Sequence, residues 1–333
     1  MLQKQIPIGI EYVVTHNNPH LDEVAALWIL KKWGTEEFPG IKKAKILFHP
    51  DRHIGPNGTS FEELEKKGYL FLGIGGGKFD DHQKKTEKEC CATLVAQYLE
   101  ADDDPALNYI LKYVFQNDKK AGAHPWEFAN LIKDYFDLHE KEDHQEVVRW
   151  AMEPLEVKYR KQLMFLEAEE EFEKKSEIFK ITLVSNFNEQ KMISIALVYG
   201  DNIMLSKVGL SKGVGIIVQK GESGNVQIYI NKKIGIPKIS LACAFAKIRF
   251  AEQVANKKVI TSNWEELKAP GYVKGASNWF YHEEGQFFLN GSKTATAPPT
   301  KLEIKKILRC LTESLVYKKR KTFKVLRQER ENK

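Results

Sequence analysis

Two short groups of histidine and carboxylate side chains give the sequence its strongest chemical signal. The first is His16-Asn-Asn-Pro-His20-Leu-Asp22, in which two imidazoles and one carboxylate lie within seven residues. This mixture of nitrogen and oxygen donors suits Mn²⁺, Fe²⁺ or Zn²⁺, and a set richer in carboxylates also holds Mg²⁺. The alternative is that Asn18 and Asp22 cap the turn while both histidines are exposed to solvent.

The second group is Phe79-Asp80-Asp81-His82-Gln83, which directly follows a glycine-rich segment. Two adjacent carboxylates beside a histidine repel each other unless a cation or a proton neutralises them. The pattern therefore predicts a cation site, with an Asp-rich helix N-terminus after a glycine turn as the alternative.

The glycine-rich segment, residues 73–77, matches neither of the common phosphate-binding loops. Around Lys78, Leu72 and Phe79 stand where a Walker A loop requires glycine and Ser/Thr. Lys78 also stands where the third glycine of the G-x-G-x-x-G pattern would fall. The sequence thus argues against a P-loop NTPase and against a dinucleotide-binding dehydrogenase.

Both groups follow predicted strands, which places them at one edge of a sheet. The β-branched and apolar residues of 8–14 predict a buried strand, and residues 44–48 and 69–72 predict a second and a third strand. The helix predicted to begin at Leu21 carries acidic residues in its first turn, as its dipole favours. Parallel sheets place ligands in the loops at the carboxyl ends of their strands.

The 333 residues exceed the usual size of one domain, so we expect two. Further helices predicted at 90–99, 105–115 and 126–136 complete an α/β domain, residues 1–138, with a mostly parallel sheet flanked by helices. Residues 139–178 predict a helical connector made of a pair of helices, because Pro154 interrupts the helical pattern. Residues 179–333 predict a smaller α+β domain with four strands, a hairpin turn at 221–224 and a glycine-rich hairpin at 281–292. Its helices are predicted at 240–256 and 301–318.

Composition describes an ordinary globular protein, with 42% hydrophobic and 29% charged residues. No apolar run is long enough for a membrane span, no signal peptide is evident, and four scattered cysteines do not form a disulfide framework. We therefore expect a cytoplasmic protein with no membrane partner. After Tyr317, sixteen residues hold eight Lys/Arg against two Glu. They form either a solvated helix end or a contact for RNA or DNA.

In their order along the chain, the two groups resemble the motifs of the DHH phosphoesterase superfamily, and within it the melanocyte-proliferation-type exonucleases. Residues 15–23 are similar to T-H-x-G-x-F-H-x-D-E, and residues 79–83 are similar to F-D-H-H-Q. The resemblance implies one or two Mn²⁺ or Mg²⁺ ions held by His16, His20, Asp22, Asp80, Asp81 and, by position along the chain, Asp118. It also implies catalytic roles for Asp81 and His82, with His82 near the substrate phosphate.

Residues 279–294 resemble the H-A-S-G-F-I-G-G-N-K-T stretch of the same subfamily. In DHH proteins this smaller domain binds substrate through a glycine-rich loop, whose backbone N–H groups are good phosphate donors. The resemblance thus implies substrate contacts by His82, His282, Gly285, Asn290, Gly291 and Ser292. The alternative is an ordinary hairpin turn at Asn290-Gly291.

The sequence departs from the family pattern at two positions. Gly73 replaces an Asp that bridges both ions in two-metal members, and Asp81 replaces the first His of the DHH motif. The first change puts one ion in doubt, and the second favours Mg²⁺ or Mn²⁺. We expect a metal-dependent phosphodiesterase or exonuclease-like hydrolase acting on a single-stranded RNA or DNA end or a short oligonucleotide. The alternative is a catalytically degenerate relative that binds nucleotide, nucleic acid or a protein partner. Both hypotheses are compatible with a homodimer.

Overall fold

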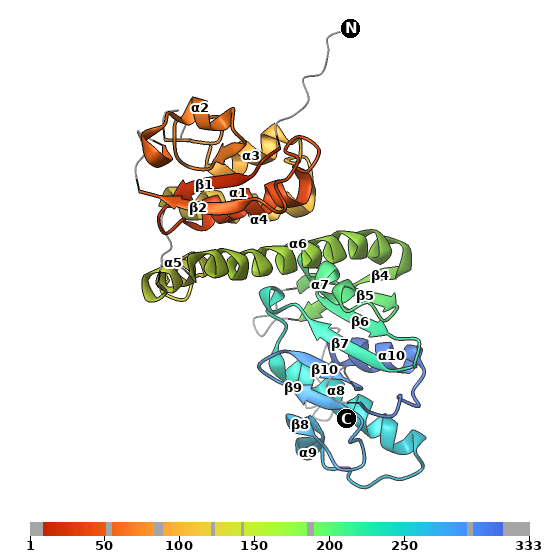
Figure 1. Cartoon of the computed structure of the whole chain (residues 1–333). Coiled ribbons are helices and arrows are strands. Elements are labelled where there is room, and N and C mark those ends of the chain that lie inside the picture. Colours follow the sequence, from red (N-terminus) through yellow and green to blue (C-terminus); the bar gives the residue numbers. More distant parts are fainter. Residues whose placement is uncertain are drawn as a thin grey trace, which may run out of the picture. The chain divides into compact units, whose positions relative to one another are not determined.

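The computed structural model describes residues 9–50, 55–82, 89–120, 124–140, 143–184, 190–291 and 296–315. The chain divides into two compact units, Met1–Met164 and Phe165–Lys333. Each unit combines helices with its own β-sheet, so the predicted α/β fold class is confirmed (Figure 1). The two units are nearly equal in length, and the boundary between them falls inside one long helix.

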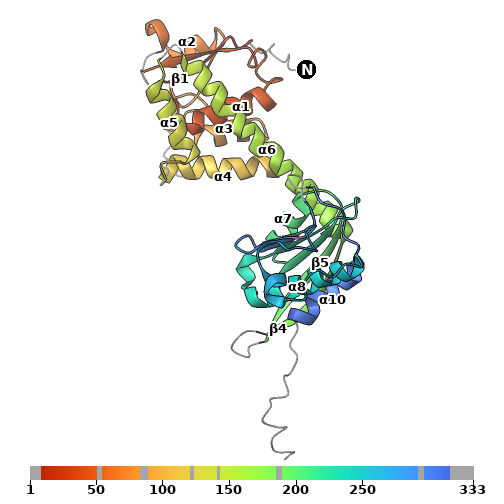
Figure 2. The ribbon, with the colours of Figure 1, turned by 90° about the horizontal axis from the view of Figure 1, so that it is seen from below.

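That helix, α6, runs from His144 to Lys175 without interruption (Figure 2). The prediction of two helices divided at Pro154 is wrong. A proline inside a helix removes one backbone hydrogen bond and crowds the preceding turn. Here the residues around it are held by packing, because Val147, Ala151, Leu155 and Tyr159 recur every fourth position and are buried. Tertiary burial along one face of the helix outweighs the local preference of the proline.

The first unit contains a three-stranded parallel sheet in the order β2-β1-β3. Its strands are β1 (Tyr12–His16), β2 (Lys45–His49) and β3 (Tyr69–Phe71). Tyr12 pairs with Lys45 on one side and with Tyr69 on the other, so all three strands point the same way. The mostly parallel sheet predicted from the alternation of strands and helices is therefore confirmed.

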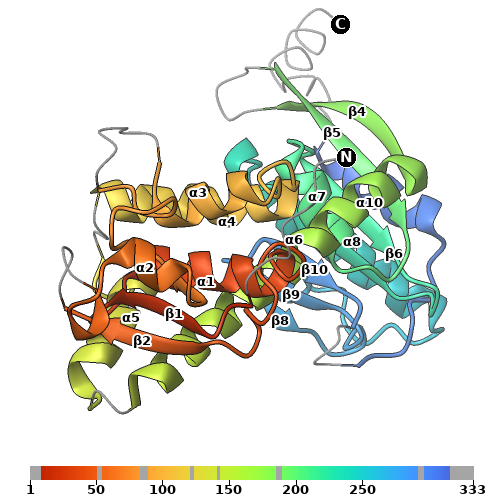
Figure 3. The same ribbon diagram turned by 45° about the horizontal axis from the view of Figure 1, so that its top comes forward.

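Helix α1 (Leu21–Trp33) follows β1 and is buried at every position from Leu21 to Leu30. It packs against α3 (Cys91–Tyr98) and α4 (Pro105–Lys120) (Figure 3). Burial on all sides agrees with its sequence, which is apolar around its whole circumference. The unit also contains α2 (Phe61–Glu65) and α5 (Phe128–Leu138). His16 is the last residue of β1, His20 precedes α1, and Asp22 lies in the first turn of this buried helix.

The second unit contains a seven-stranded mixed sheet in the order β4-β5-β6-β7-β10-β9-β8. Only the β5–β6 pair is parallel, and the other pairs are antiparallel. The hairpin predicted at 221–224 joins two antiparallel strands and is confirmed. The strands are β4 (Ser176–Val184), β5 (Gln190–Tyr199), β6 (Ile216–Lys220), β7 (Val226–Ile230), β8 (Gly271–Tyr272), β9 (Phe280–His282) and β10 (Phe287–Leu289).

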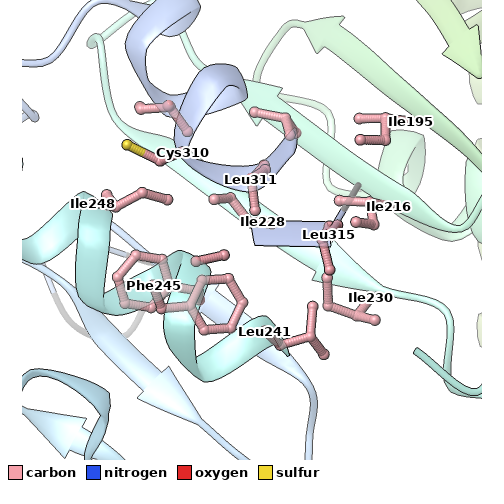
Figure 4. Packing of buried hydrophobic residues seen from close by; sticks show 14 of the residues in the cluster. Ile195, Ile216, Ile228, Ile230, Leu241, Phe245, Ile248, Cys310, Leu311 and Leu315 are labelled. Carbon is pink, nitrogen blue, oxygen red and sulfur yellow. The ribbon is translucent and has the colours of Figure 1, made fainter. Parts of the chain in front are cut away.

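The main core of this unit lies between the sheet and two helices, α8 (Lys238–Ala255) and α10 (Ile304–Leu315). Phe245, Leu311 and Ile228 meet there with other aliphatic side chains (Figure 4). A smaller cluster contains side chains of α6, of α7 (Met204–Ser211) and of strands β5 and β6. A helix at 204–211 was not predicted. Gly209 lets it approach the sheet, since a Cβ there would lie 2.4 Å from the Ile217 side chain. The short α9 (Trp264–Lys268) completes the unit.

A buried polar network fixes the segment that follows β10. The Asn290 side chain is fully buried, and its Nδ2 donates to the carbonyl oxygens of Asn278 at 2.8 Å and Pro298 at 2.9 Å. Its Oδ1 accepts from the backbone N–H of Thr300 at 2.8 Å. The buried Glu252 carboxylate accepts from Trp279 Nε1 at 3.1 Å and from the hydroxyl of Thr300. These bonds hold residues 296–301 against the sheet.

We predict that Asn290→Ala destabilises the second unit by at least about 2 kcal/mol. The change leaves two carbonyl groups and one N–H without their partner, and each unsatisfied buried group typically costs about 1–3 kcal/mol. Urea unfolding followed by tryptophan fluorescence, with Trp279 in the same network, measures the effect. A free energy of unfolding unchanged from wild type would contradict the role given to this network.

Candidate metal centre

The loop between β1 and α1 is organised around the carboxylate of Glu23. Its Oε1 lies 2.9 Å from His16 Nε2, and its Oε2 accepts from the backbone N–H of His20 at 2.8 Å. Burial by itself would raise the pKa of Glu23, but the hydrogen bond from His16 and the charges of His16 and His20 lower it below its usual value. Glu23 is therefore an ionised side chain whose two oxygens both contact protein donors.

Asp22 joins the start of α1 to the start of α3. Its carboxylate is buried and accepts from the backbone N–H groups of Cys91 at 2.7 Å and Ala92 at 2.8 Å. Burial and the neighbouring charge of Glu23 raise the pKa of Asp22 to about 8, and the charge of Asp118 adds to this rise. A cation placed nearby would favour the ionised form of Asp22. The suggestion that Asp22 caps its own turn is thus replaced by a contact with a different helix.

Asp80, Asp81 and His82 follow β3 after a turn built from glycines. Gly73, Gly75 and Gly76 all have positive φ, which residues with a side chain rarely adopt. The turn directs the N–H of Gly76 at Asp80 Oδ2, at 2.7 Å. Asp80 Oδ1 accepts from the backbone N–H of His82 at 3.0 Å and lies 2.9 Å from its Nδ1. Asp80 therefore orients the His82 ring.

The ionisation of Asp80 follows from these contacts. Burial by itself would raise the pKa of Asp80, but hydrogen bonds from Gly76 and His82, together with the charge of His82, lower it. Asp80 is thus ionised near neutral pH. His82 Nδ1 also lies 3.8 Å from Asp81 Oδ1, and the His82 side chain is 41% exposed. The group joins two carboxylates with an imidazole that solvent can reach.

These three residues form the only described group of this kind. Within the residues that the structure describes, Asp80, Asp81 and His82 alone present three or more ligand atoms that all lie within 4.8 Å of one another. The rings of His16 and His20 lie 5.5 Å apart, edge to face, but neither belongs to this group. Asp22 and Asp118 are outside it as well. The structure therefore brings together two of the six predicted metal ligands, Asp80 and Asp81, with His82, which was predicted to be catalytic and to contact the substrate.

Asp118 is linked to the group through a residue that the sequence did not point to. Lys119 Nζ lies 3.1 Å from Asp118 Oδ2 and 3.1 Å from Asp81 Oδ2. Burial by itself would lower the pKa of Lys119, but the hydrogen bonds and charges of Asp118 and Asp81 raise it above its usual value. A charged ammonium thus lies between two carboxylates. A lysine at the end of a helix carries no sequence signal for this contact.

At position 73, where the resemblance implies an Asp, the structure has no room for an added side chain. Gly73 has a φ of 64°, and a Cβ on it would lie 2.6 Å from Glu23 Oε1 and 2.9 Å from Glu23 Cγ. The carboxylate of Glu23 thus fills the space beside Gly73. Glu23 was quoted in the motif but not predicted to be part of the site.

In the second unit the predicted substrate-binding residues have different surroundings. His282 Nδ1 accepts from the backbone N–H of Gly285 at 2.6 Å, which closes the turn between β9 and β10. The Asn290 side chain faces the protein interior, as described above. Gly291 lines a cavity of about 280 Å³, whose walls include Asp201, Gln227 and Tyr229. Ser292 lies outside the described residues.

No protein family matches the chain, and no curated protein sequence resembles it significantly. Among the described helices, none has the length and apolar character needed to cross a lipid bilayer.

We predict that Asp80→Asn destabilises the first unit by about 1–3 kcal/mol in the presence of EDTA. The amide turns an N–H₂ group toward a donor that the carboxylate had satisfied. Asp81→Asn is the matched control, because Asp81 takes part in partly exposed ion pairs worth about 0–1 kcal/mol. Urea unfolding at pH 7 measures both variants.

The difference in stability between wild type and Asp80→Asn depends on pH. Because the folded-state pKa of Asp80 is depressed, its contribution is present above the ordinary value of 3.8 and is lost as the pH falls through the lowered value. The stability difference between wild type and Asp80→Asn should therefore shrink in acid. Equal losses for the two variants at pH 7 would contradict the role given to Asp80.

Proposed function

We propose that the first unit binds a divalent cation at Asp80, Asp81 and His82, and that the chain is a metal-dependent phosphodiesterase of the DHH type. The substrate would be an end of single-stranded RNA or DNA, or a short oligonucleotide. The observation that carries this proposal is the compact group of two carboxylates and one imidazole after β3. The resemblance of residues 15–23 and 79–83 to the motifs of that superfamily supplies the reaction class.

The donor set suits the ion that the proposal requires. Asp80 is held ionised by its hydrogen bonds, and Asp81 Oδ2 lies 3.1 Å from the ammonium nitrogen of Lys119. Two anionic oxygens and one imidazole nitrogen favour Mn²⁺ or Mg²⁺ over the softer ions that thiolates select. The described cysteines nearest this group, Cys90 and Cys91, are buried, and burial raises the pKa of both thiols, so they stay protonated.

When bound, the divalent ion supplies Lewis-acid activation of water and of a phosphate oxygen. The residues around it have separate tasks. Without the ion, Asp80 orients the His82 ring through the contact between its Oδ1 and Nδ1. With Nδ1 as the ligand of the ion, the N–H at Nε2 of the exposed ring would donate to a phosphate oxygen of the substrate. Within the second unit, Gly291 and the cavity beside it are a proposed substrate contact of that unit.

The proposed cellular setting follows from the cysteines and the charge. Cys90, Cys91, Cys243 and Cys310 are all free thiols, which fits the reducing conditions of the cytoplasm. The basic segment after Tyr317 lies outside the described residues. It supports a polyanionic substrate through its charge, which lowers the free energy of encounter with a phosphate backbone.

A second candidate function is binding without catalysis. Gly73 favours it, because this position supplies no carboxylate and the space beside it is filled by Glu23. A centre with fewer ligands can hold a nucleotide phosphate through its ion and still fail to activate water. Both functions require the metal ion to bind, but only the first includes turnover of a substrate.

We predict Mn²⁺-dependent hydrolysis of bis(p-nitrophenyl) phosphate that falls at least about 100-fold in Asp81→Asn and in His82→Ala. Asp134→Asn is the control, because Asp134 is an exposed carboxylate on α5. Release of nitrophenolate measures turnover, and calorimetric titration measures Mn²⁺ binding. Binding without turnover would favour the second function, and hydrolysis that persists in Asp81→Asn would refute this centre.

A further inference from the structure

Asp81 uses its two carboxylate oxygens in two different directions. Oδ1 lies 3.8 Å from His82 Nδ1, on the side of the proposed metal group, while Oδ2 lies 3.1 Å from Lys119 Nζ. In centres with two metal ions, a carboxylate often faces both ions in this way, and the ions lie about 3.5–4 Å apart. Here the partner on the second side is an ammonium group.

The second side has the ligands that a cation would need. Lys119 Nζ contacts Asp118 Oδ2 as well as Asp81 Oδ2, each at 3.1 Å. The two carboxylates come from different elements, the segment after β3 and helix α4, and are only 11% and 23% exposed. Two partly buried carboxylates facing the same point repel each other unless a positive charge lies between them. The lysine supplies that charge from within the chain.

The surroundings of Gly73 also limit the number of carboxylates available to a second metal ion. No side chain projects from this position, and Glu23 fills the space beside it. Both oxygens of Glu23 already contact protein donors, His16 Nε2 and the backbone N–H of His20. The end of β3 therefore supplies no further carboxylate, so a second cation would depend on Asp81 and Asp118.

We propose that Lys119 is a built-in cation that replaces a second metal ion, so that the centre holds a single divalent ion. This inference rests on the proposed function, because it assumes that Asp80, Asp81 and His82 bind a metal. An ammonium has three N–H groups, and the contacts with Asp81 and Asp118 use two of them. The third can donate to a phosphate oxygen of a substrate bound at the single ion.

The test counts Mn²⁺ ions on the full-length chain. Wild type, Lys119→Met and Lys120→Met are titrated with Mn²⁺, and free Mn²⁺ is followed by its electron paramagnetic resonance signal. We expect about one ion on wild type and about two on Lys119→Met, because methionine keeps the length of the side chain and uncovers both carboxylates. Lys120→Met is the matched control, since Lys120 is the next residue of α4 and is exposed. It should bind one ion.

The outcomes separate this inference from the function on which it rests. A wild type that binds no Mn²⁺ refutes the proposed metal centre itself. A wild type that binds two ions, or a folded Lys119→Met that still binds one or binds none, overturns the role of Lys119 and leaves the centre in place. Two ions on both lysine variants also overturn it. If Lys119→Met does not fold by circular dichroism, Lys119→Gln replaces it, and Lys119→Arg should keep one ion because it retains the charge.

Discussion

Repulsion between carboxylates is the constraint on which the first unit is built. Asp22, Glu23, Asp80, Asp81 and Asp118 gather around the segments that follow β1 and β3, and their charges are compensated in several ways. Asp22 accepts two N–H groups at the start of α3, and Glu23 contacts His16 and the N–H of His20. Asp80 accepts from Gly76 and His82, while Asp81 and Asp118 share an ammonium. If backbone dipoles were the only compensation, the carboxylates of Asp81 and Asp118 would repel each other. The position of Lys119 between them is therefore important.

The scaffold makes this concentration of charge possible because its backbone groups are already oriented. The N–H groups that reach Asp22 are the unpaired donors at the start of a helix, and the N–H that reaches Asp80 comes from a glycine turn. Neither requires a flexible side chain to be ordered. Helix α1 is buried over ten consecutive residues, so the loop before it moves little relative to the sheet. A carboxylate fixed in this way presents its charge at a defined place, which a binding site for a small cation needs.

Sequence reasoning predicted the elements whose signal is local and missed those set by tertiary contacts. The buried strands and the hairpin at 221–224 were predicted because apolar patterning and turn residues act over a few positions. The break at Pro154 was wrong because packing along α6 outweighs the proline. In the site, Asp80, Asp81 and His82 are adjacent in sequence, so their grouping could be predicted. Lys119 could not, since it is 38 residues from Asp81 and only the folding of α4 beside β3 brings them together.

An ammonium and a divalent metal ion are not equivalent cations, and their difference assigns distinct tasks to the two sides of Asp81. Asp118 and Asp81 raise the pKa of Lys119, so its single charge is present near neutral pH and compensates both carboxylates whether or not a metal is bound. It cannot act as a Lewis acid, and it does not lower the pKa of water as a metal does. Activation of water therefore belongs to the side of Asp80 and His82, where a divalent ion would bind. The Lys119 side contributes fixed positive charge for a phosphate group. A centre of this kind needs only half the metal of a two-ion site, and its architecture does not depend on the supply of a second ion.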